Sequence, residues 1–148
     1  MPATDLALLI DAAREAGEIA MRYFRNDPDV TDKPDGAGPV TAADLAVNAM
    51  LETRLRIARP DYGWLSEESL DSGDRLAAEK VFIIDPIDGT RTFIEGGKDW
   101  SLLLAHFTSK YMVRHLRLRP GGKSEKIGTW RMAMALAPTT VLGPGGLA

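Results

Sequence analysis

Two carboxylates stand at the end of an apolar run in the segment FIIDPIDGTRTFIEGG, residues 82–97. Pro86 lies between Asp85 and Asp88; it fixes its own φ and lacks a backbone donor, which favours a tight turn over a continuing strand. Such a turn can aim both carboxylates and the Ile87 carbonyl into one small volume. Hard oxygen ligands of this kind suit Mg²⁺, which also keeps several waters. The spacing therefore indicates a magnesium site at this turn.

Gly89 and Thr90 follow the second aspartate and open a helix or turn whose free N–H groups can hold a phosphate. The alternative interpretation makes both aspartates turn formers or helix caps, which is the commoner role of a lone D-x-x-D pair. A haloacid-dehalogenase type of site is excluded by spacing. Its D-x-D-G-T motif is one residue shorter than D-P-I-D-G-T, and the extra residue turns the second carboxylate away from its acid/base position.

Two further carboxylate sites strengthen the metal hypothesis. In LSEES, Glu67 and Glu68 follow an expected strand, so one can face a cleft while the other faces solvent. The alternative is a solvated acidic loop. In GPVTAAD, Asp44 lies three residues after Thr41, a spacing typical of a capping box at a helix start. A capping role and a role in the site can coexist.

The elements that position these residues indicate an α+β fold. Helical periodicity predicts a helix over about residues 5–25, and Thr41 is the expected N-cap of a second helix over 41–58. The runs VFIID (81–85) and WSLLLA (100–105) are expected strands of an antiparallel sheet on which both helices pack. Helices first and strands after, without regular alternation, argue against a wound parallel sheet.

The composition is that of an ordinary globular protein of 148 residues, 45% hydrophobic and 26% charged. There is no cysteine, which excludes disulfides, thiolate metal sites and a cysteine nucleophile. Asp5 and Asp11 interrupt the N-terminal apolar stretch, so no signal peptide is expected there. No stretch reaches a membrane-spanning length. We therefore expect a cytoplasmic protein that does not enter membranes.

GPVTAAD, WLSEES and IDPIDGTRTFI, in that order, resemble the Mg²⁺-dependent, Li⁺-sensitive phosphatase superfamily that includes the inositol monophosphatases. The resemblance implies the first half of the layered αβαβα sugar-phosphatase fold and two or three Mg²⁺ ions per site. It implies that Glu67, Asp85 and the Ile87 carbonyl bind one metal, and that Asp85 and Asp88 share a second. It also places Lys33 near the site, where the alternative is a solvated loop lysine.

The same resemblance implies roles around a small phosphorylated substrate. Asp88, Gly89 and Thr90 would bind the substrate phosphate, while Asp44, Thr90 and Glu67 would be the catalytic residues that orient and activate an attacking water. LSEE and GTRTFI look more like the 3'(2'),5'-bisphosphate nucleotidases (CysQ-like) of the superfamily. The implied substrate is then adenosine 3',5'-bisphosphate, a by-product of sulfate assimilation; inositol 1-phosphate is the alternative.

The resemblance covers about residues 5–105, and members of the superfamily are roughly twice as long as this chain. Their second half carries a WDxAA motif whose Asp completes the second metal site. Here the nearest counterpart is TWRMAMALA, with Arg131 in place of that Asp, and an arginine repels a metal. We therefore divide the chain into a metal- and phosphate-binding half-domain (1–105) and a divergent segment (106–148). A truncated, catalytically poor metal-binding fragment is a further alternative.

The charge balance changes at the same place. Residues 1–105 carry 11 Lys and Arg against 20 Asp and Glu, whereas residues 106–148 carry seven basic residues against one glutamate. Three interpretations stay open for this segment, which ends in a Gly- and Pro-rich tail: an altered or out-of-frame C-terminus, a basic nucleic-acid arm, or a domain edge that pairs with a second copy as a homodimer. The first is favoured; with only Tyr111 and Trp130 as stacking aromatics, a nucleic-acid partner is not expected.

Overall fold

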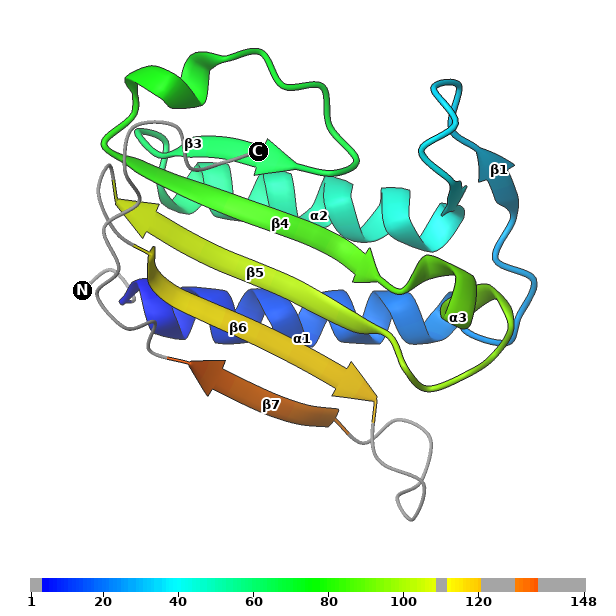
Figure 1. Cartoon of the computed structure of the whole chain (residues 1–148). Helices are drawn as coiled ribbons and strands as arrows, with labels where there is room; N and C mark the ends of the chain where they lie inside the picture. The colour runs from blue at the N-terminus through cyan, green and yellow to red at the C-terminus, as the bar shows by residue number, and fades with distance from the viewer. Residues whose placement is uncertain (1–3, 109–111, 121–129, 136–148) are drawn as a thin grey trace.

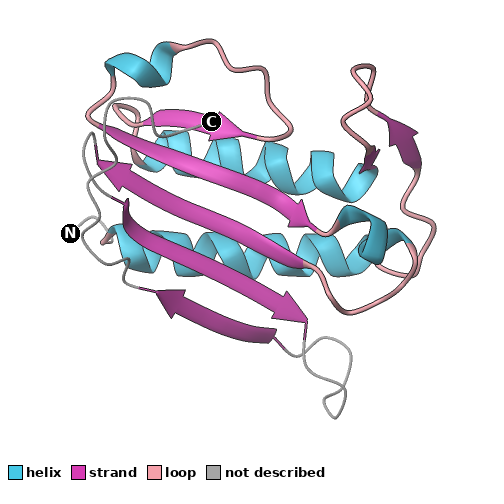
Figure 2. Ribbon diagram, viewed as in Figure 1, coloured by secondary structure: helices cyan, strands magenta, loops and turns pink. Residues whose placement is uncertain are grey.

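The structure is a computed structural model that describes residues 4–108, 112–120 and 130–135, with side chains described up to residue 107. Two long helices, a short third helix and a five-stranded sheet make up the fold (Figures 1 and 2). The elements in chain order are α1 (Asp5–Tyr23), β1 (Val30–Asp32), β2 (Pro39–Thr41), α2 (Ala42–Ala58), β3 (Gly63–Ser66), the 3₁₀ helix η1 (Asp74–Ala77), β4 (Lys80–Asp88), α3 (Thr90–Ile94), β5 (Ser101–Thr108), β6 (Met112–Pro120) and β7 (Trp130–Ala135).

The main sheet has the strand order β3-β4-β5-β6-β7, and α1 and α2 lie side by side on one of its faces (Figure 1). All neighbouring strands are antiparallel except β3 and β4, which run parallel. The predicted α+β fold, with two helices on the sheet, is confirmed. The predicted strands 81–85 and 100–105 pair antiparallel as β4 and β5, whereas β3 adds a parallel neighbour whose connection to β4 carries the 3₁₀ helix rather than an α-helix.

The core lies between the helices and the sheet. Leu9 of α1, Leu51 and Leu55 of α2, and Phe82 and Leu102 of the sheet have no exposed surface. Apart from Leu8 and Leu9, the buried face of α1 is built from alanines and a glycine, and such small side chains let α1 approach α2 closely. Among the described helices, none combines the length and apolar character that a membrane crossing needs.

The strand β4 continues through the predicted turn. It reaches Asp88 rather than ending at Asp85, so the expectation that the strand stops at the first aspartate is wrong. In the pairing with β5, Asp85 lies opposite Leu103 and Asp88 lies opposite Ser101. Three steps on β4 thus match two on β5, which defines a β-bulge with one extra residue. Pro86 fits a bulge because it has no N–H to give to the ladder.

The bulge decides where the two aspartates point. Residues three apart in a regular strand face opposite sides of a sheet. Here Ile84 and Ile87 both enter the core under the helices, and Asp85 and Asp88 both face away from it. The extra residue therefore brings to one face two carboxylates that regular alternation would separate.

The predicted division of the chain at residue 105 stays a prediction. β5 extends to Thr108, and β6 and β7 continue the same sheet. Arg131 is the second residue of β7. The Gly- and Pro-rich tail predicted at the C-terminus lies outside the described residues.

Candidate active site

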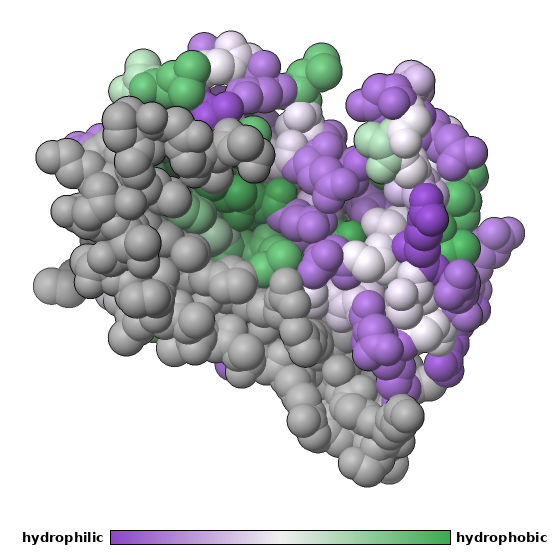
Figure 3. Space-filling model, viewed as in Figure 1, coloured by the Kyte–Doolittle hydropathy of each residue, from purple (hydrophilic) through white to green (hydrophobic). Residues whose placement is uncertain are grey.

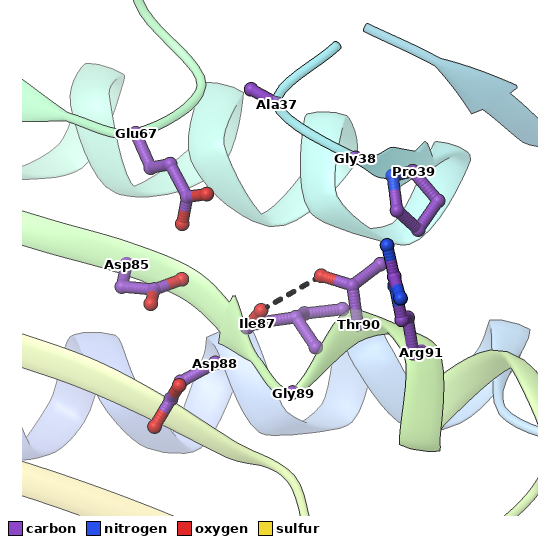
Figure 4. A pocket seen from close by; sticks show the side chains of 10 residues that line it. All are labelled: Ala37, Gly38, Pro39, Glu67, Asp85, Ile87, Asp88, Gly89, Thr90 and Arg91. Carbon is purple, nitrogen blue, oxygen red and sulfur yellow. Dashed lines mark hydrogen bonds between the residues drawn. The ribbon is translucent and has the colours of Figure 1, made fainter.

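A cavity of about 410 Å³ opens where β3 and β4 end. Most of the predicted site residues line it, together with the β1–β2 hairpin loop and Arg91: Ala37, Gly38, Pro39, Glu67, Asp85, Ile87, Asp88, Gly89, Thr90 and Arg91 (Figure 4). Figure 3 shows hydrophilic side chains gathered on this face next to the hairpin, beside a hydrophobic area over the sheet. Lys33 and Asp44 do not line the cavity, but each contacts a residue that does.

The parallel pairing of β3 and β4 explains why Glu67 meets the aspartates. Parallel strands end at the same edge of a sheet, so the residue after β3 lies beside the end of β4. The Glu67 N–H donates to the Ile84 carbonyl at 3.3 Å, which places the Glu67 side chain next to Asp85. On the other side, the Ser101 hydroxyl donates to Asp88 Oδ2 at 3.3 Å. Three carboxylates from two strands therefore surround one cavity.

The Asp85 carboxylate lies in an electrostatically unfavourable environment. Burial, followed by the charges of Glu67 and Asp88, raises its pKa from 3.8 to about 7. Its Oδ1 atom is buried and accepts no hydrogen bond from any residue in the described part of the chain. A buried carboxylate oxygen without a donor is costly, and a cation in the cavity would remove that cost.

Lys33 links the hairpin to the two glutamates. Its ammonium donates to Glu68 Oε1 at 3.0 Å and to Glu67 Oε1 at 3.2 Å. Burial lowers the pKa of Lys33, but the hydrogen bonds to both glutamates outweigh that effect and raise it overall. The Glu68 side chain is only 6% exposed and its pKa is raised by burial, whereas the Glu67 side chain is 51% exposed. Lys33 is therefore paired at the site rather than solvated.

Asp44 caps a helix and contacts the cavity at the same time. It is fully buried, and its Oδ2 accepts from the Thr41 N–H at 2.8 Å and from the Thr41 hydroxyl at 2.6 Å, which completes a capping box on α2. Its Oδ1 lies 3.2 Å from the Thr90 hydroxyl. Burial raises the pKa of Asp44, while the bonds from Thr41 and Thr90 act in the opposite direction. Asp44 thus caps α2 while it contacts a residue that lines the cavity, and its catalytic role stays a prediction.

Two features position Thr90: the turn at Gly89 before it and the packing of Phe93 on Trp100 after it. Gly89 adopts φ +94°, and a Cβ there would lie 2.8 Å from the Asp99 carbonyl oxygen, so only glycine fits. Phe93 of α3 packs edge-to-face on Trp100 with ring centroids 4.8 Å apart. The Thr90 hydroxyl also lies 3.0 Å from the Ile87 carbonyl; with one proton to donate, it serves Ile87 or Asp44 and can accept from a third group.

The donor set fits a hard divalent cation. The groups facing the cavity are carboxylate oxygens and the Ile87 carbonyl, which is the chemistry that Mg²⁺ prefers. Asp85 Oδ1 supplies an acceptor that no described group uses. Within the described residues, no three carboxylates yet converge on one point. The Glu67 carboxylate points toward Asp85 (Figure 4) and also accepts from Lys33, so a cation bound here would compete with the Lys33 ammonium for it.

Three residues of the arrangement are absent from the predicted set. Ser101 reaches Asp88 only because the bulge shifts the β4–β5 register, and the linear sequence carries no signal for that. Glu68 is buried and paired with Lys33; the sequence alone did not show which of Glu67 and Glu68 would turn inward. Arg91 follows Thr90 directly, so its position in the chain was a usable signal.

Comparisons with known proteins identify the family of this chain. Residues 2–114 match the Inositol monophosphatase family. The chain is 42% identical to the 3'-phosphoadenosine 5'-phosphate phosphatase of Mycobacterium leprae over 103 residues, which are 69% of this chain and 36% of the relative. It is 36% identical to inositol monophosphatase 1 of Sus scrofa over 89 residues, 59% of this chain and 32% of the relative.

The fold agrees as well. The structure of the extragenic suppressor protein suhB of Bartonella henselae superposes with a TM-score of 0.64 at 28% identity, over 76% of this chain and 42% of that one. The chain thus spans about a third of the curated relatives named above and less than half of this solved structure. On the family match over most of its length, this chain belongs to the inositol monophosphatase family.

Proposed function

We propose that the protein is an Mg²⁺-dependent phosphomonoesterase that removes the 3'-phosphate of adenosine 3',5'-bisphosphate. The observation that carries the proposal is one cavity in which Glu67, Asp85 and Asp88 lie beside a Thr90 hydroxyl in contact with buried Asp44. The first group of residues offers metal ligands, and the second offers a path for a proton. A phosphate ester hydrolysed by water needs both.

Glu67, Asp85, Asp88 and the Ile87 carbonyl would hold Mg²⁺, which when bound lowers the pKa of water and offsets the phosphate charge. The protein's own groups do the rest. The Thr90 oxygen accepts a hydrogen bond from the attacking water, and its own proton is directed at Asp44 Oδ1, 3.2 Å away. As water attacks phosphorus in line, its proton passes through Thr90 to Asp44. The raised pKa of Asp44 suits a proton acceptor.

The substrate phosphate would contact Asp88 indirectly and the backbone N–H groups of Gly89 and Thr90 directly. Gly89 supports this role because it lines the cavity, and its positive φ forms the turn that precedes Thr90. Lys33 would keep Glu67 and Glu68 in place. These assignments rest on the cavity geometry together with the family membership.

The preference for adenosine 3',5'-bisphosphate rests on the similarity to the mycobacterial phosphatase, whose name carries the same compound. Inositol 1-phosphate is the second candidate, supported by the porcine inositol monophosphatase. Because the chain spans about a third of these relatives, a metal-binding fragment with poor turnover is the third. A cytoplasmic location, inhibition by Li⁺, a role in sulfur metabolism and a homodimer belong to the same proposal.

The test measures phosphate release from both substrates with and without millimolar Mg²⁺, beside titration calorimetry of Mg²⁺ binding. Release from the nucleotide, abolished by EDTA, is the expected result. Thr90→Ala should keep Mg²⁺ binding and remove hydrolysis, because the hydroxyl moves a proton and is not a metal ligand in this proposal. Faster release from inositol 1-phosphate favours the second candidate. Metal binding without any turnover supports the third, and absence of both refutes all three.

A further inference from the structure

The cavity has a basic end that the proposed chemistry does not use. Among the residues that line it, Glu67, Asp85 and Asp88 are acidic, and Arg91 is the one basic residue. Figure 4 shows the carboxylates grouped on one side and the Arg91 guanidinium on the other, beside Pro39 of the hairpin. The Ile87 carbonyl and Thr90 lie between the two ends. The cavity is therefore polarised along its length.

Arg91 differs from other cations around the site. Lys33 is paired with two glutamates, and Arg25 donates to the Gly96 carbonyl through Nε at 3.0 Å and Nη2 at 2.8 Å. Arg91 is exposed, and its guanidinium makes no hydrogen bond or ion pair with the described residues. Glu95, one turn later on the same segment, forms no ion pair with it either. Arg91 thus offers its full set of donors to a ligand.

We propose that Arg91 binds the second phosphate of a bisphosphorylated substrate and so selects bisphosphates over monophosphates. This inference rests on the proposed function, because it takes the acidic end of the cavity as the place of the reacting phosphate. A second phosphate beside the same carboxylates would be repelled, so it is placed best at the opposite end. A guanidinium matches phosphate oxygens in a bidentate geometry, which adds direction as well as charge.

The size of the cavity agrees with a ligand of this kind. A volume of about 410 Å³ exceeds what one phosphate fills and lies in the range of small-molecule sites. A nucleoside 3',5'-bisphosphate carries its phosphates on opposite sides of the ribose, so one group can lie at each end. An inositol monophosphate carries a single phosphate and leaves Arg91 without an anionic partner.

The experiment compares adenosine 3',5'-bisphosphate with adenosine 3'-monophosphate in the full chain with Mg²⁺. Arg91→Gln should lower kcat/KM for the bisphosphate by about tenfold, mainly through KM, since one charge-assisted contact is lost. The same variant should leave the monophosphate within about twofold. For the bisphosphate, the kcat/KM of Arg91→Lys should lie between those of the wild type and Arg91→Gln. The matched control is Arg14→Gln, which removes the same charge from an exposed position on α1 outside the cavity.

If Arg91→Gln lowered kcat/KM equally for both nucleotides, the inference would be overturned, since Arg91 would then act on the reacting phosphate. No loss for either would overturn it as well. If the wild type turns over neither nucleotide, the proposed function fails separately, and the four proteins are titrated with both nucleotides by calorimetry. A preference for the bisphosphate that disappears only in Arg91→Gln upholds the inference. An unchanged preference, or binding of neither nucleotide, overturns it.

Discussion

Replacing Asp85 by Asn should stabilise the metal-free protein. The side chain keeps its shape and loses a charge that burial disfavours and that Glu67 and Asp88 repel. The Asp85 pKa rises from 3.8 to about 7 on folding, and at about 1.36 kcal/mol per pH unit this sets a ceiling of about 4 kcal/mol. Because the side chain is partly exposed, water screens the repulsion, and we expect a gain of about 1–2 kcal/mol.

The gain depends on pH in a definite direction. The folded-state pKa of Asp85 lies above the unfolded value, so the folded protein holds this proton more tightly. The resulting contribution to stability is complete below pH 3.8 and is lost as the pH rises through about 7. Asp85→Asn should therefore come closest to the wild type at low pH, with an advantage that already exists at pH 5, grows as the pH rises and is complete at pH 8.

The assay is thermal unfolding in EDTA between pH 5 and pH 8, repeated with Mg²⁺ in hundredfold excess over its Kd. In EDTA the expected gain raises Tm by about 3–8 °C at pH 8 for a chain of this size. Mg²⁺ should stabilise the wild type by about 2.7 kcal/mol and leave Asp85→Asn unchanged. Asp61→Asn, at an exposed position, is the matched control and should change neither response.

Two results would refute this reasoning. A lower Tm for Asp85→Asn at pH 8 in EDTA would mean that the charged carboxylate stabilises the bulge. Equal Mg²⁺ shifts for the wild type and Asp85→Asn would mean that Asp85 is not a ligand. After the second result both aspartates of the motif would be turn formers rather than a metal site.

Three further changes have expected outcomes in urea unfolding. Gly89→Ala should cost more than about 1 kcal/mol, because its Cβ would meet the Asp99 carbonyl at 2.8 Å; Gly36→Ala, also at positive φ but with no atom within 4 Å, should cost less, and equal costs would contradict the clash. Thr41→Ala should cost about 1–2 kcal/mol by removing the capping box of α2, whereas Thr41→Ser keeps it; a similar loss in both would contradict the capping role. Lys33→Met should cost about 1–3 kcal/mol by leaving Glu68 buried without its cation, and the cost should grow as rising pH ionises Glu68; a cost that does not vary with pH would contradict this.

The helices were predictable because their signals are local. Thr4 and Thr41 accept from the N–H groups of the first turns, as their positions before the apolar periodicity indicate. The strands were predictable as β-branched and aromatic runs. The parallel pairing of β3 with β4 was not, because the partner of a strand depends on packing between segments distant in the sequence.

The candidate site was predictable as a set of residue types but not as a geometry. Asp85 and Asp88 stand three apart, and alternation alone would send them to opposite faces of the sheet. Only the bulge reconciles the spacing with a shared cavity, and Pro86 was its single local sign. Ser101 enters the site through the strand register, which residue spacing does not encode, whereas Arg91 follows Thr90 directly and its position in the chain was a usable signal.

The bulge in β4 also determines what kind of change the site tolerates. A strand with one residue fewer would still present the two aspartates on one face, now two positions apart, but it would lose the backbone oxygen of Ile87 that contacts Thr90. What the insertion adds is thus a carbonyl, and every amino acid carries one. The identity of residue 87 is set instead by its buried side chain, so Ile87→Val leaves this oxygen in place. The carbonyl therefore depends on the number of residues between the two aspartates. A comparison of side chains between relatives would not detect this requirement.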